Sequence, residues 1–309
     1  MEGNLSKGTV ATIGTYDGVH LGHQAVLGVL LDVARSRGAD PVACIFEVPP
    51  RRSIAPSPSP HLLLPIELRR RILSRYVERV VTLDFTEVRD LEPTAFVEEV
   101  LVGKQEIQDV VVGSGFRFGR GRTGSIEDLR RLGPKLGFRA HGVPPVIAGA
   151  QPISSTRIRR QVADGHVDEA AKLLGRPPVL WGRVTHGQKV GRTLDRPTAN
   201  LDIHPHVLLP ADGVYMAHAF WGGRREHALL YVGRRPTLGG GERRCEVHVL
   251  SEDAFDAYDL GMEVHVHAML REDRRFDSLD ALRAQIDRDV KAAIARRAEH
   301  PVTIDPICG

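Results

Sequence analysis

A short apolar run that passes through a glycine-rich turn into a helical pattern places the strongest limit on the fold of this chain. Residues 10–13 are apolar, residues 14–23 read GTYDGVHLGH, and residues 24–37 have the spacing of an amphipathic helix. A strand that turns through glycines into a helix leaves backbone N–H groups free at the helix start, and such a site favours phosphate. Because His20 and His23 lie in this turn, we expect a βα unit with a binding site at its junction.

The two histidines have two interpretations. A His-x-Gly-His segment by itself is compatible with a surface turn that carries two solvated side chains. Alternatively, the imidazoles donate to the phosphates of a nucleotide and stabilise the charge that develops on an expelled pyrophosphate. The strand before the turn, the helix after it and Asp17 within it favour the nucleotide site.

Strand-like and helix-like segments alternate along the first half of the chain. The predicted strands are residues 9–14, 41–46, 79–85 and 109–113, and the predicted helices are residues 24–37, 66–76 and 93–102. This alternation is typical of a parallel sheet covered by helices. Ligands of such sheets bind at the carboxyl ends of the strands, where His20 and His23 would lie.

Two short helices, then several short strands, are predicted in the second half. Ser154 or Ser155 caps the first helix, which ends at Gly165, and the second helix ends at Gly175. Strand-like runs follow at residues 180–185, 213–220, 226–233, 244–250 and 262–270, separated by Gly and Pro turns. These runs favour a small antiparallel barrel, closed by a last helix that begins at Ser278. We therefore expect two domains, residues 1–180 and 181–309.

The length and charge of the chain exclude several kinds of protein. A chain of 309 residues is long enough for two domains, each with its own core. The net charge of +3, from 42 basic and 39 acidic residues, is too balanced to indicate a nucleic-acid or membrane-surface partner. The arginine clusters at residues 51–52, 69–71 and 296–297 are short, and we interpret them as solvated faces.

The cysteines and the hydropathy indicate an intracellular location. Cys44, Cys245 and Cys308 are widely separated and odd in number, so they predict neither a disulfide framework nor a metal site. Cys44 lies in an apolar run and is expected in the core. We find no signal peptide and no apolar run of about 18 residues, and we expect a cytoplasmic protein.

Two segments of the first half combine groups that suit phosphate. Residues 113–124, GSGFRFGRGRTG, hold five glycines and three arginines, although a flexible basic loop would have the same composition. Residues 153–159, ISSTRIR, begin a helix with three hydroxyls followed by Arg157 and Arg159, which suits a second phosphate contact. An ordinary helix cap with a solvated basic face is the alternative.

Two features of the second half suggest metal binding and proton transfer. Thr198 and Asn200 offer hard oxygen atoms two residues apart, and magnesium prefers oxygen ligands, so these side chains and ATP phosphates could share the ion. Turn-forming Thr and Asn are the alternative. Glu246 lies in a strand-like run with Val247 and Val249, and it is either the acceptor of a substrate hydroxyl proton or an outward-facing strand residue.

Taken together and in this order, these segments resemble the bacterial bifunctional riboflavin kinase/FMN adenylyltransferase family, also called FAD synthetase. GTYDGVHLGH is similar to its nucleotidyltransferase signature, and GFRFG, ISSTRIR and GHVDEAAKLLGRP are similar to its later motifs. GRTLDRPTANL resembles the Pro-Thr-Ala-Asn motif of its kinase half. The remaining blocks are LPADGVY, VGRRPT, CEVHVL and LREDRRFDSLDALRAQIDRD.

The resemblance implies a fold and two reactions. The fold would be an α/β Rossmann-like nucleotidyltransferase domain followed by a small six-stranded antiparallel β-barrel with a C-terminal helix. Both reactions would need ATP and Mg²⁺: riboflavin would be phosphorylated to FMN, and FMN would be adenylylated to FAD with release of pyrophosphate. The resemblance implies riboflavin, FMN and ATP as the ligands, and it leaves the oligomeric state open.

The resemblance also implies a role for individual residues. His20 and His23 would bind the ATP phosphates, and Glu246 would be the base of the kinase. The other nucleotide or phosphate contacts would be Gly14, Tyr16, Asp17, Gly22, Ser154, Ser155, Thr156, Arg159, Gly187, Gly191 and Arg192. The flavin contacts would be Phe116, Phe118 and Arg271, and the metal ligands Thr198 and Asn200.

Several positions depart from the family pattern and keep two alternatives open. Residues 46–50 read FEVPP, with Val48, where the family usually has Phe-x-Pro-His-Pro. The other departures are Gly115 for Asp or Asn, Asp195-Arg196 for Gly-Phe, Tyr231 for Asn and Asp259 for Gly. The alternatives are a specialised paralogue, with one half silent or with a changed nucleotide or flavin analogue, and a non-catalytic flavin-nucleotide-binding regulator.

Overall fold

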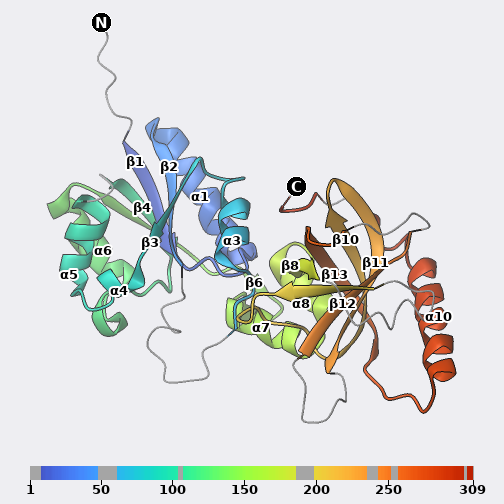
Figure 1. The fold of residues 1–309 in the computed structure, drawn as a ribbon. Coiled ribbons are helices and arrows are strands. Elements are labelled where there is room, and N and C mark those ends of the chain that lie inside the picture. Colours follow the sequence, from blue (N-terminus) through green and yellow to red (C-terminus); the bar gives the residue numbers. More distant parts are fainter. Residues whose placement is uncertain are drawn as a thin grey trace, which may run out of the picture. The chain divides into compact units, whose positions relative to one another are not determined.

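The computed structural model divides into two compact units, each described below by itself (Figure 1). It describes residues 8–47, 61–103, 107–185, 198–234, 243–251, 257–302 and 305–308. The first unit comprises Met1–Pro60 and Ile66–Ser154, and the second comprises His61–Pro65 and Ser155–Gly309.

The first unit is built on a five-stranded parallel sheet, as the alternating pattern predicted. Its strands are β1 (Thr9–Gly14), β2 (Asp40–Phe46), β3 (Arg79–Leu83), β4 (Ile107–Gly113) and β5 (Arg139–Val143). The order across the sheet is β3-β2-β1-β4-β5, and all neighbouring strands are parallel. The strand order reverses beside β1, and in open α/β sheets ligands bind at the carboxyl ends of the strands at such a point. The turn that carries His20 lies at this end of β1.

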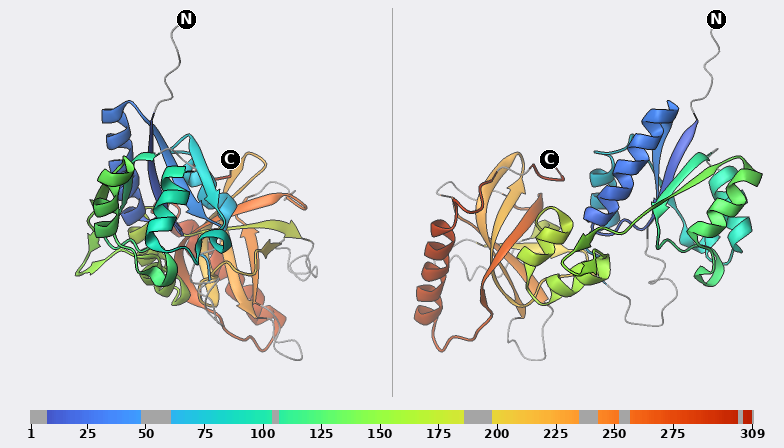
Figure 2. Two further views of the ribbon diagram at one scale, coloured as in Figure 1. Left: turned by 90° about the vertical axis from the view of Figure 1, so that its left-hand side faces the viewer. Right: turned by 180° about the vertical axis from the view of Figure 1, so that it is seen from behind.

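Helices cover both faces of this sheet, as the two further views also show (Figure 2). The helical elements are α1 (Leu21–Arg37), α3 (Ile66–Leu73), α4 (Phe85–Val88), α5 (Pro93–Phe96), the π-helix η1 (Val97–Gly103), the 3-10 turn η2 (Arg120–Arg122) and α6 (Ile126–Leu136). Two short strands, β6 (Ile147–Ala148) and β7 (Gln151–Pro152), pair with each other. Cys44 is buried in the core on one face of the sheet, as predicted.

Some predicted elements have different limits in the structure. The third strand ends at Leu83 because Asp84 caps the next helix: its carboxylate accepts a bond from Thr86 N, and Phe85 is helical. Helix α6 and strand β5 were not predicted, although the side chains of Ser125 and Asp128 form a capping box at the start of α6. This pairing is a recognisable signal for a helix start.

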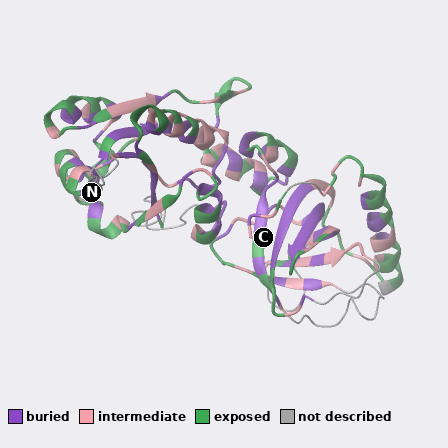
Figure 3. Ribbon diagram, turned by 90° about the horizontal axis from the view of Figure 1, so that it is seen from above, coloured by how far each residue is buried: buried purple, intermediate pink, exposed green. Residues whose placement is uncertain are grey.

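The second unit is a closed six-stranded barrel with two helices before it and one after it. The helices are α7 (Ser155–Ala163), α8 (Val167–Leu174) and α10 (Leu279–Ala295). The strands are β8 (Val179–Thr185), β9 (Ala199–Ile203), β10 (Gly213–Trp221), β11 (Arg224–Arg234), β12 (Arg243–Val249) and β13 (Gly261–Glu272), in the order β10-β11-β12-β9-β8-β13. The barrel is thus confirmed, and β9 is the strand that the pattern of short runs did not predict. The strands are mostly buried, whereas α10 keeps one face exposed (Figure 3).

Helix α8 packs on the barrel and α7 packs on α8, so both helices belong to the second unit. Val167 of α8 lies in the barrel core, and Gly165 between the helices has φ 81°. A Cβ at Gly165 would lie 2.5 Å from Met269 Cε and 3.2 Å from Tyr215 Oη, so only glycine allows this approach. The compact units thus divide after Ser154. As functional domains, residues 1–180 and 181–309 stay a prediction.

A five-residue piece from the first half of the sequence also belongs to the second unit. Leu62 forms a parallel bridge with Val207: Leu62 N donates to His206 O at 2.7 Å, and Leu208 N donates to Leu62 O at 2.8 Å. The His61 carbonyl accepts a bond from Arg159 Nε at 2.7 Å. The chain therefore contributes residues 61–65 to the second unit before it returns to the first.

Candidate active sites

The turn between β1 and α1 has an unusual backbone that brings its histidines together. Tyr16 and Val19 have positive φ values of 49° and 39°, and Gly18 lies between them at 85°. Positive φ is rare for a side chain other than glycine, and a β-branched valine there is strained. Such strain persists only where the surroundings hold the chain, and it is common at functional sites.

His20 and His23 stack at the first turn of α1. His20 is the N-cap of this helix, and its Nδ1 accepts a bond from His23 N at 3.3 Å. The two ring centroids are 3.6 Å apart, and the ring planes are inclined by only 14°. A Cβ at Gly22 would lie 3.1 Å from the His20 ring, so glycine leaves room for this arrangement. The structure therefore brings the predicted pair into contact.

His23 keeps one polar atom without a partner. Its Nδ1 is buried and forms no hydrogen bond within the part of the chain that the structure describes. Burial, with His20 and Arg69 adding to the effect, holds the pKa of His23 well below its usual value. A neutral imidazole has one N–H donor and one lone pair. His23 is thus an uncharged group with hydrogen-bonding capacity left for a ligand.

Tyr16 supports the His23 ring from within the core. Its side chain is buried, and its hydroxyl lies 2.5 Å from Thr12 Oγ1. The centroids of the Tyr16 and His23 rings are 4.9 Å apart, and Gly14 gives the Tyr16 ring space. Burial raises the pKa of Tyr16 well above its usual value, so the phenol stays neutral. Tyr16 therefore packs against the His23 ring from the side of the core.

The interpretation of residues 69–71 as a solvated face was wrong for Arg69. Arg70 and Arg71 are exposed, but Arg69 has no exposed surface at all. The reason is helix periodicity, since Arg69 shares the inner face of α3 with Leu68 and Leu73. Asp17, from the β1–α1 turn, is also buried and attracts the Arg69 guanidinium.

The second group of predicted phosphate contacts spans the point where the units divide. Ser154 ends the first unit, and the carbonyl of Ile153 before it would lie 3.8 Å from a Cβ at Gly22. Ser155, Thr156 and Arg159 belong to α7 in the second unit. The contact of Arg159 with the His61 carbonyl was not predicted from the sequence.

The two phenylalanines predicted to bind flavin differ in exposure. Phe118 is buried in the core of the first unit, and Phe116 packs on it with ring centroids 5.7 Å apart. Backbone bonds in both directions between Phe118 and Gly124 hold this loop. Phe116 is half-buried, so it is the one of the two with surface left for a ligand.

In the second unit the strand register places the predicted kinase residues side by side. Thr185 of β8 pairs with Asn200 of β9, Asn200 pairs with Glu246 of β12, and Glu246 pairs with Tyr231 of β11. Their neighbours Ala199, Leu201, Cys245 and Val247 fill the barrel core. Because successive side chains of a strand point to opposite faces, these four polar residues form one row on the outer face. Asn200 and Glu246 are therefore direct neighbours.

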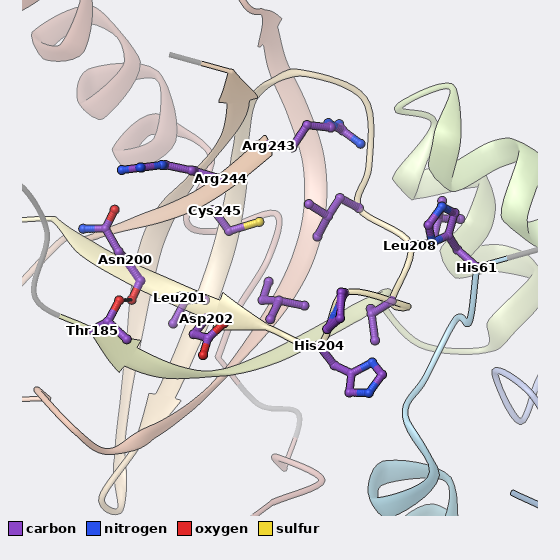
Figure 4. Close-up of a pocket in the computed structure, with 14 residues that line it drawn as sticks. His61, Thr185, Asn200, Leu201, Asp202, His204, Leu208, Arg243, Arg244 and Cys245 are labelled. Atoms are coloured by element: carbon purple, nitrogen blue, oxygen red, sulfur yellow. Dashed lines mark hydrogen bonds between the residues drawn. The ribbon is translucent and has the colours of Figure 1, made fainter. Parts of the chain in front are cut away.

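A cavity of about 880 Å³ begins at one end of this row (Figure 4). It extends along β9 from Thr185 and Asn200 to His204 and His61. Arg243 and Arg244 give it a basic border, and Asp212 holds Arg243 through a bond of 2.7 Å to Nε. The cavity has room for a large ligand beside Asn200. Thr198 directly precedes β9, and Gly187, Gly191 and Arg192 lie outside the described residues.

Arg271, predicted to bind flavin, is paired with a carboxylate. Its Nε donates to both oxygen atoms of Asp289 in α10, at 3.1 and 3.0 Å, and its guanidinium carbon lies 5.7 Å from the Phe276 ring centroid. A paired, stacked guanidinium has a fixed plane. Arg271 therefore ties α10 to β13, a role that the sequence did not indicate.

The departures from the family pattern have distinct structural settings. A Cβ at Gly115 would meet nothing within 4 Å, so packing does not require glycine there. Asp259 has φ 63°, a left-handed conformation that Asp tolerates better than most residues. Tyr231 donates to Asp273 at 3.3 Å, and burial raises the pKa of its phenol to about 12. Val48, Asp195 and Arg196 lie outside the described residues.

The described residues contain no group of three or more His, Cys, Asp or Glu side chains that could hold a metal ion. None of the helices among them has the length and apolar character needed to cross a membrane.

Comparison with known proteins agrees with this division into two sites. A family model of FAD synthetase matches residues 3–157, and one of riboflavin kinase matches residues 174–296. Two curated relatives carry the name bifunctional riboflavin kinase/FMN adenylyltransferase. The protein from Pseudomonas fluorescens is 38% identical over 94% of each chain, and that from Escherichia coli K12 is 35% identical over 93% of each.

A solved structure has the same architecture over nearly its whole length. It is described as a macrolide-efflux protein from Streptococcus pneumoniae, and it is 32% identical to this chain. The match has a TM-score of 0.85 and covers 93% of this chain and 94% of the other. With both family models matched in order and the relatives aligned almost end to end, this chain belongs to the family of bifunctional riboflavin kinase/FMN adenylyltransferases.

Proposed function

We propose that this chain carries out both reactions of its family and that each compact unit carries the main chemical groups of one of them. The observation that carries the proposal is that the two predicted groups are each assembled. His20 stacks on His23 in the first unit, and Asn200 neighbours Glu246 in the second. In this proposal riboflavin is phosphorylated to FMN in the second unit, and FMN is adenylylated to FAD in the first.

The first reaction site needs positioning and charge stabilisation rather than a base. The attacking group is the phosphate of FMN, which is already anionic near neutral pH because its second pKa is about 6. It attacks the α-phosphorus of ATP, and pyrophosphate leaves. His20, His23 and the start of α1 offer hydrogen-bond donors for the charge that develops there. The open hydrogen-bonding capacity of His23 supports this role.

The second reaction site needs a proton acceptor. The attacking group is a hydroxyl of riboflavin, which is neutral near pH 7, so a nearby carboxylate assists its attack on the γ-phosphorus of ATP. Glu246 supplies this carboxylate in the proposal, and its pairing with Asn200 in the strand register supports this role.

The oxygen donors around Asn200 fit a magnesium ion that arrives with ATP. Thr198 and Asn200 provide a hydroxyl and an amide oxygen, and Mg²⁺ usually takes its other ligands from water and substrate phosphates. When bound, the ion would neutralise charge on the transferred phosphoryl group. The phosphate-binding roles of Ser154, Ser155, Thr156 and Arg159 stay predictions.

One incubation tests the proposal. The pure protein is given riboflavin, ATP and Mg²⁺, and the flavins are separated by chromatography. We expect FMN first and FAD afterwards. FMN without FAD would support a paralogue whose first half is silent or redirected, and neither product would support the regulator.

A further inference from the structure

Arg69 is a buried cation at the carboxyl ends of two central strands. Its Nη1 donates to Thr15 O at 2.7 Å and to Phe46 O at 3.0 Å, and its Nη2 donates to Glu47 O at 2.5 Å. Thr15 directly follows β1, and Phe46 ends β2. One side chain from α3 therefore joins the two chain segments that leave the sheet beside the histidine pair.

Burial makes this cation costly, so its surroundings must compensate for it. A guanidinium out of water needs hydrogen bonds and an opposite charge. The three carbonyls provide the bonds, and Asp17, which is 1% exposed, has the largest effect of three attracting carboxylates. Arg69 Nε still has no partner within the described part of the chain. A buried guanidinium that is costly to desolvate and keeps an unbonded Nε indicates a role beyond packing.

One of the bonded carbonyls, that of Thr15, adjoins the strained backbone of the turn. Thr15 immediately precedes Tyr16, the first residue with positive φ, and Val19 with φ 39° directly precedes His20. A left-handed valine persists only if its neighbours over-determine the path of the chain. Arg69 fixes the start of this path through Thr15 and attracts Asp17 in its middle.

We propose that Arg69 is a positioning residue for adenylyl transfer: by holding the ends of β1 and β2 it sets the turn that presents His20 and His23. The inference rests on the proposed function of the first unit. It predicts that Arg69 acts on the rate of the transfer step and not on riboflavin phosphorylation. Small displacements of positioned groups, of about 1 Å, cost roughly 100-fold in rate.

The test compares Arg69→Gln and Arg69→Lys with Arg71→Gln as the matched control. Arg71 lies on the same helix, is exposed, and has no assigned role. We expect kcat for FAD formation to fall by about 100-fold in Arg69→Gln and by about 10-fold in Arg69→Lys, with small changes in the KM of ATP and FMN. FMN formation from riboflavin stays at the wild-type rate in all three variants.

The readout separates positioning from stability. Rates are taken per folded protein, well below the unfolding temperature of each variant, which calorimetry supplies. A kcat within twofold of wild type in both Arg69 variants would overturn the inference, even if they unfold at lower temperature. If Arg69→Gln does not fold, Arg69→Lys decides alone by the same criterion. Absence of FAD with the wild-type protein would instead contradict the proposed function.

Discussion

Each unit contains a histidine cluster, and the two differ in how completely their ring nitrogens are bonded. The first cluster is the stacked pair His20 and His23, in which the buried Nδ1 of His23 has no partner within the described residues. The second, called here the barrel cluster, comprises His218, His227, His267 and His300. Burial lowers the pKa of His23 in the first pair and of His218 and His267 in the barrel cluster, so charge does not distinguish these rings.

The barrel cluster has a defined direction of donation. His218 Nε2 donates to the His300 carbonyl at 2.9 Å, which leaves its Nδ1 as the acceptor. His267 Nε2 therefore donates to His218 Nδ1 at 3.0 Å, and His227 Nε2 donates to the same carbonyl at 3.2 Å. These bonds tie the segment after α10 to strands β10, β11 and β13. Both ring nitrogens of His218 are thus bonded, as a structural network of buried polar groups requires.

The difference teaches how a ligand-binding histidine is recognised in a fold. Both ring nitrogens of His218 are bonded within the protein, whereas His23 keeps a buried nitrogen with bonding capacity that we expect a ligand to use. The test of this comparison is whether removing each cluster affects activity or stability. The two reactions serve as independent readouts, one for each unit.

Glu246→Gln should have the largest effect and should establish that the two reactions are separable. Loss of a general base typically costs about 10³-fold, so riboflavin phosphorylation should fall by that factor while FAD formation from added FMN persists. Separate assays with riboflavin and with FMN measure this. Equal loss of both reactions in folded protein would contradict the assignment of one site to each unit.

His23→Ala should have the opposite selectivity. Removing one donor to a developing charge costs about 100-fold, so FAD formation should fall by that factor while riboflavin phosphorylation is unchanged. The variant loses ring contacts with His20 and Tyr16 but no hydrogen bond of the His23 Nδ1, so rates are taken per folded protein. Unaltered FAD formation in this variant and in the double variant with His20→Ala would contradict the assignment of adenylyl transfer to the histidine pair.

His218→Phe should affect stability instead of activity. It leaves the His267 donor unpaired in a buried position, which costs about 1–3 kcal/mol of unfolding free energy. Both tryptophans of the chain, Trp181 and Trp221, are in the barrel strands, so their fluorescence in urea reports this unit. Unchanged stability, or a selective loss of one activity in folded protein, would break the comparison.

The barrel should also become less stable in mild acid. Burial lowers the pKa of His218 to about 4 and that of His267 to about 3, below the usual value of 6.5. As the pH falls through about 6.5, the unfolded chain binds protons first, so the stability present above this pH is lost toward pH 4. Each such histidine contributes a slope of up to about 1.4 kcal/mol per pH unit.

Urea midpoints by tryptophan fluorescence at about pH 7 and about pH 5.5 measure this slope in a range where free carboxylates stay ionised. His218→Phe, which removes one titrating group, should reduce the slope. A midpoint that is independent of pH in the wild type would show that the barrel cluster is not kept neutral.

The sequence predicted the local elements well where pattern and caps agree. The turn from β1 into α1 was foreseen because glycines, an apolar run and a helical period meet there. Strand β9 was missed because Pro197 and the turn-forming Thr198 and Asn200 outweighed the alternation of Ala199 with Leu201.

Features that depend on contacts between distant parts of the sequence could not be predicted from local sequence patterns. The row from Thr185 to Tyr231 depends on the register of strands far apart in the sequence, which packing of the closed barrel sets. Arg69 was assigned to a solvated face because charged clusters usually are solvated. Arg69 can be buried because backbone carbonyls at the ends of β1 and β2 accept its hydrogen bonds. These carbonyls are far from Arg69 in the sequence, so a local pattern does not indicate them.

The bridge between Leu62 and Val207 has a consequence for modularity. A fragment that starts at Ser155 would lack the partner of two backbone bonds of the segment around Val207 and the carbonyl that Arg159 contacts. It would also lack the buried side chains of Leu62 and Leu64, which belong to the second unit. The sequence segments of the two units therefore alternate along the chain. Recombination at a single point between them would not exchange a complete unit.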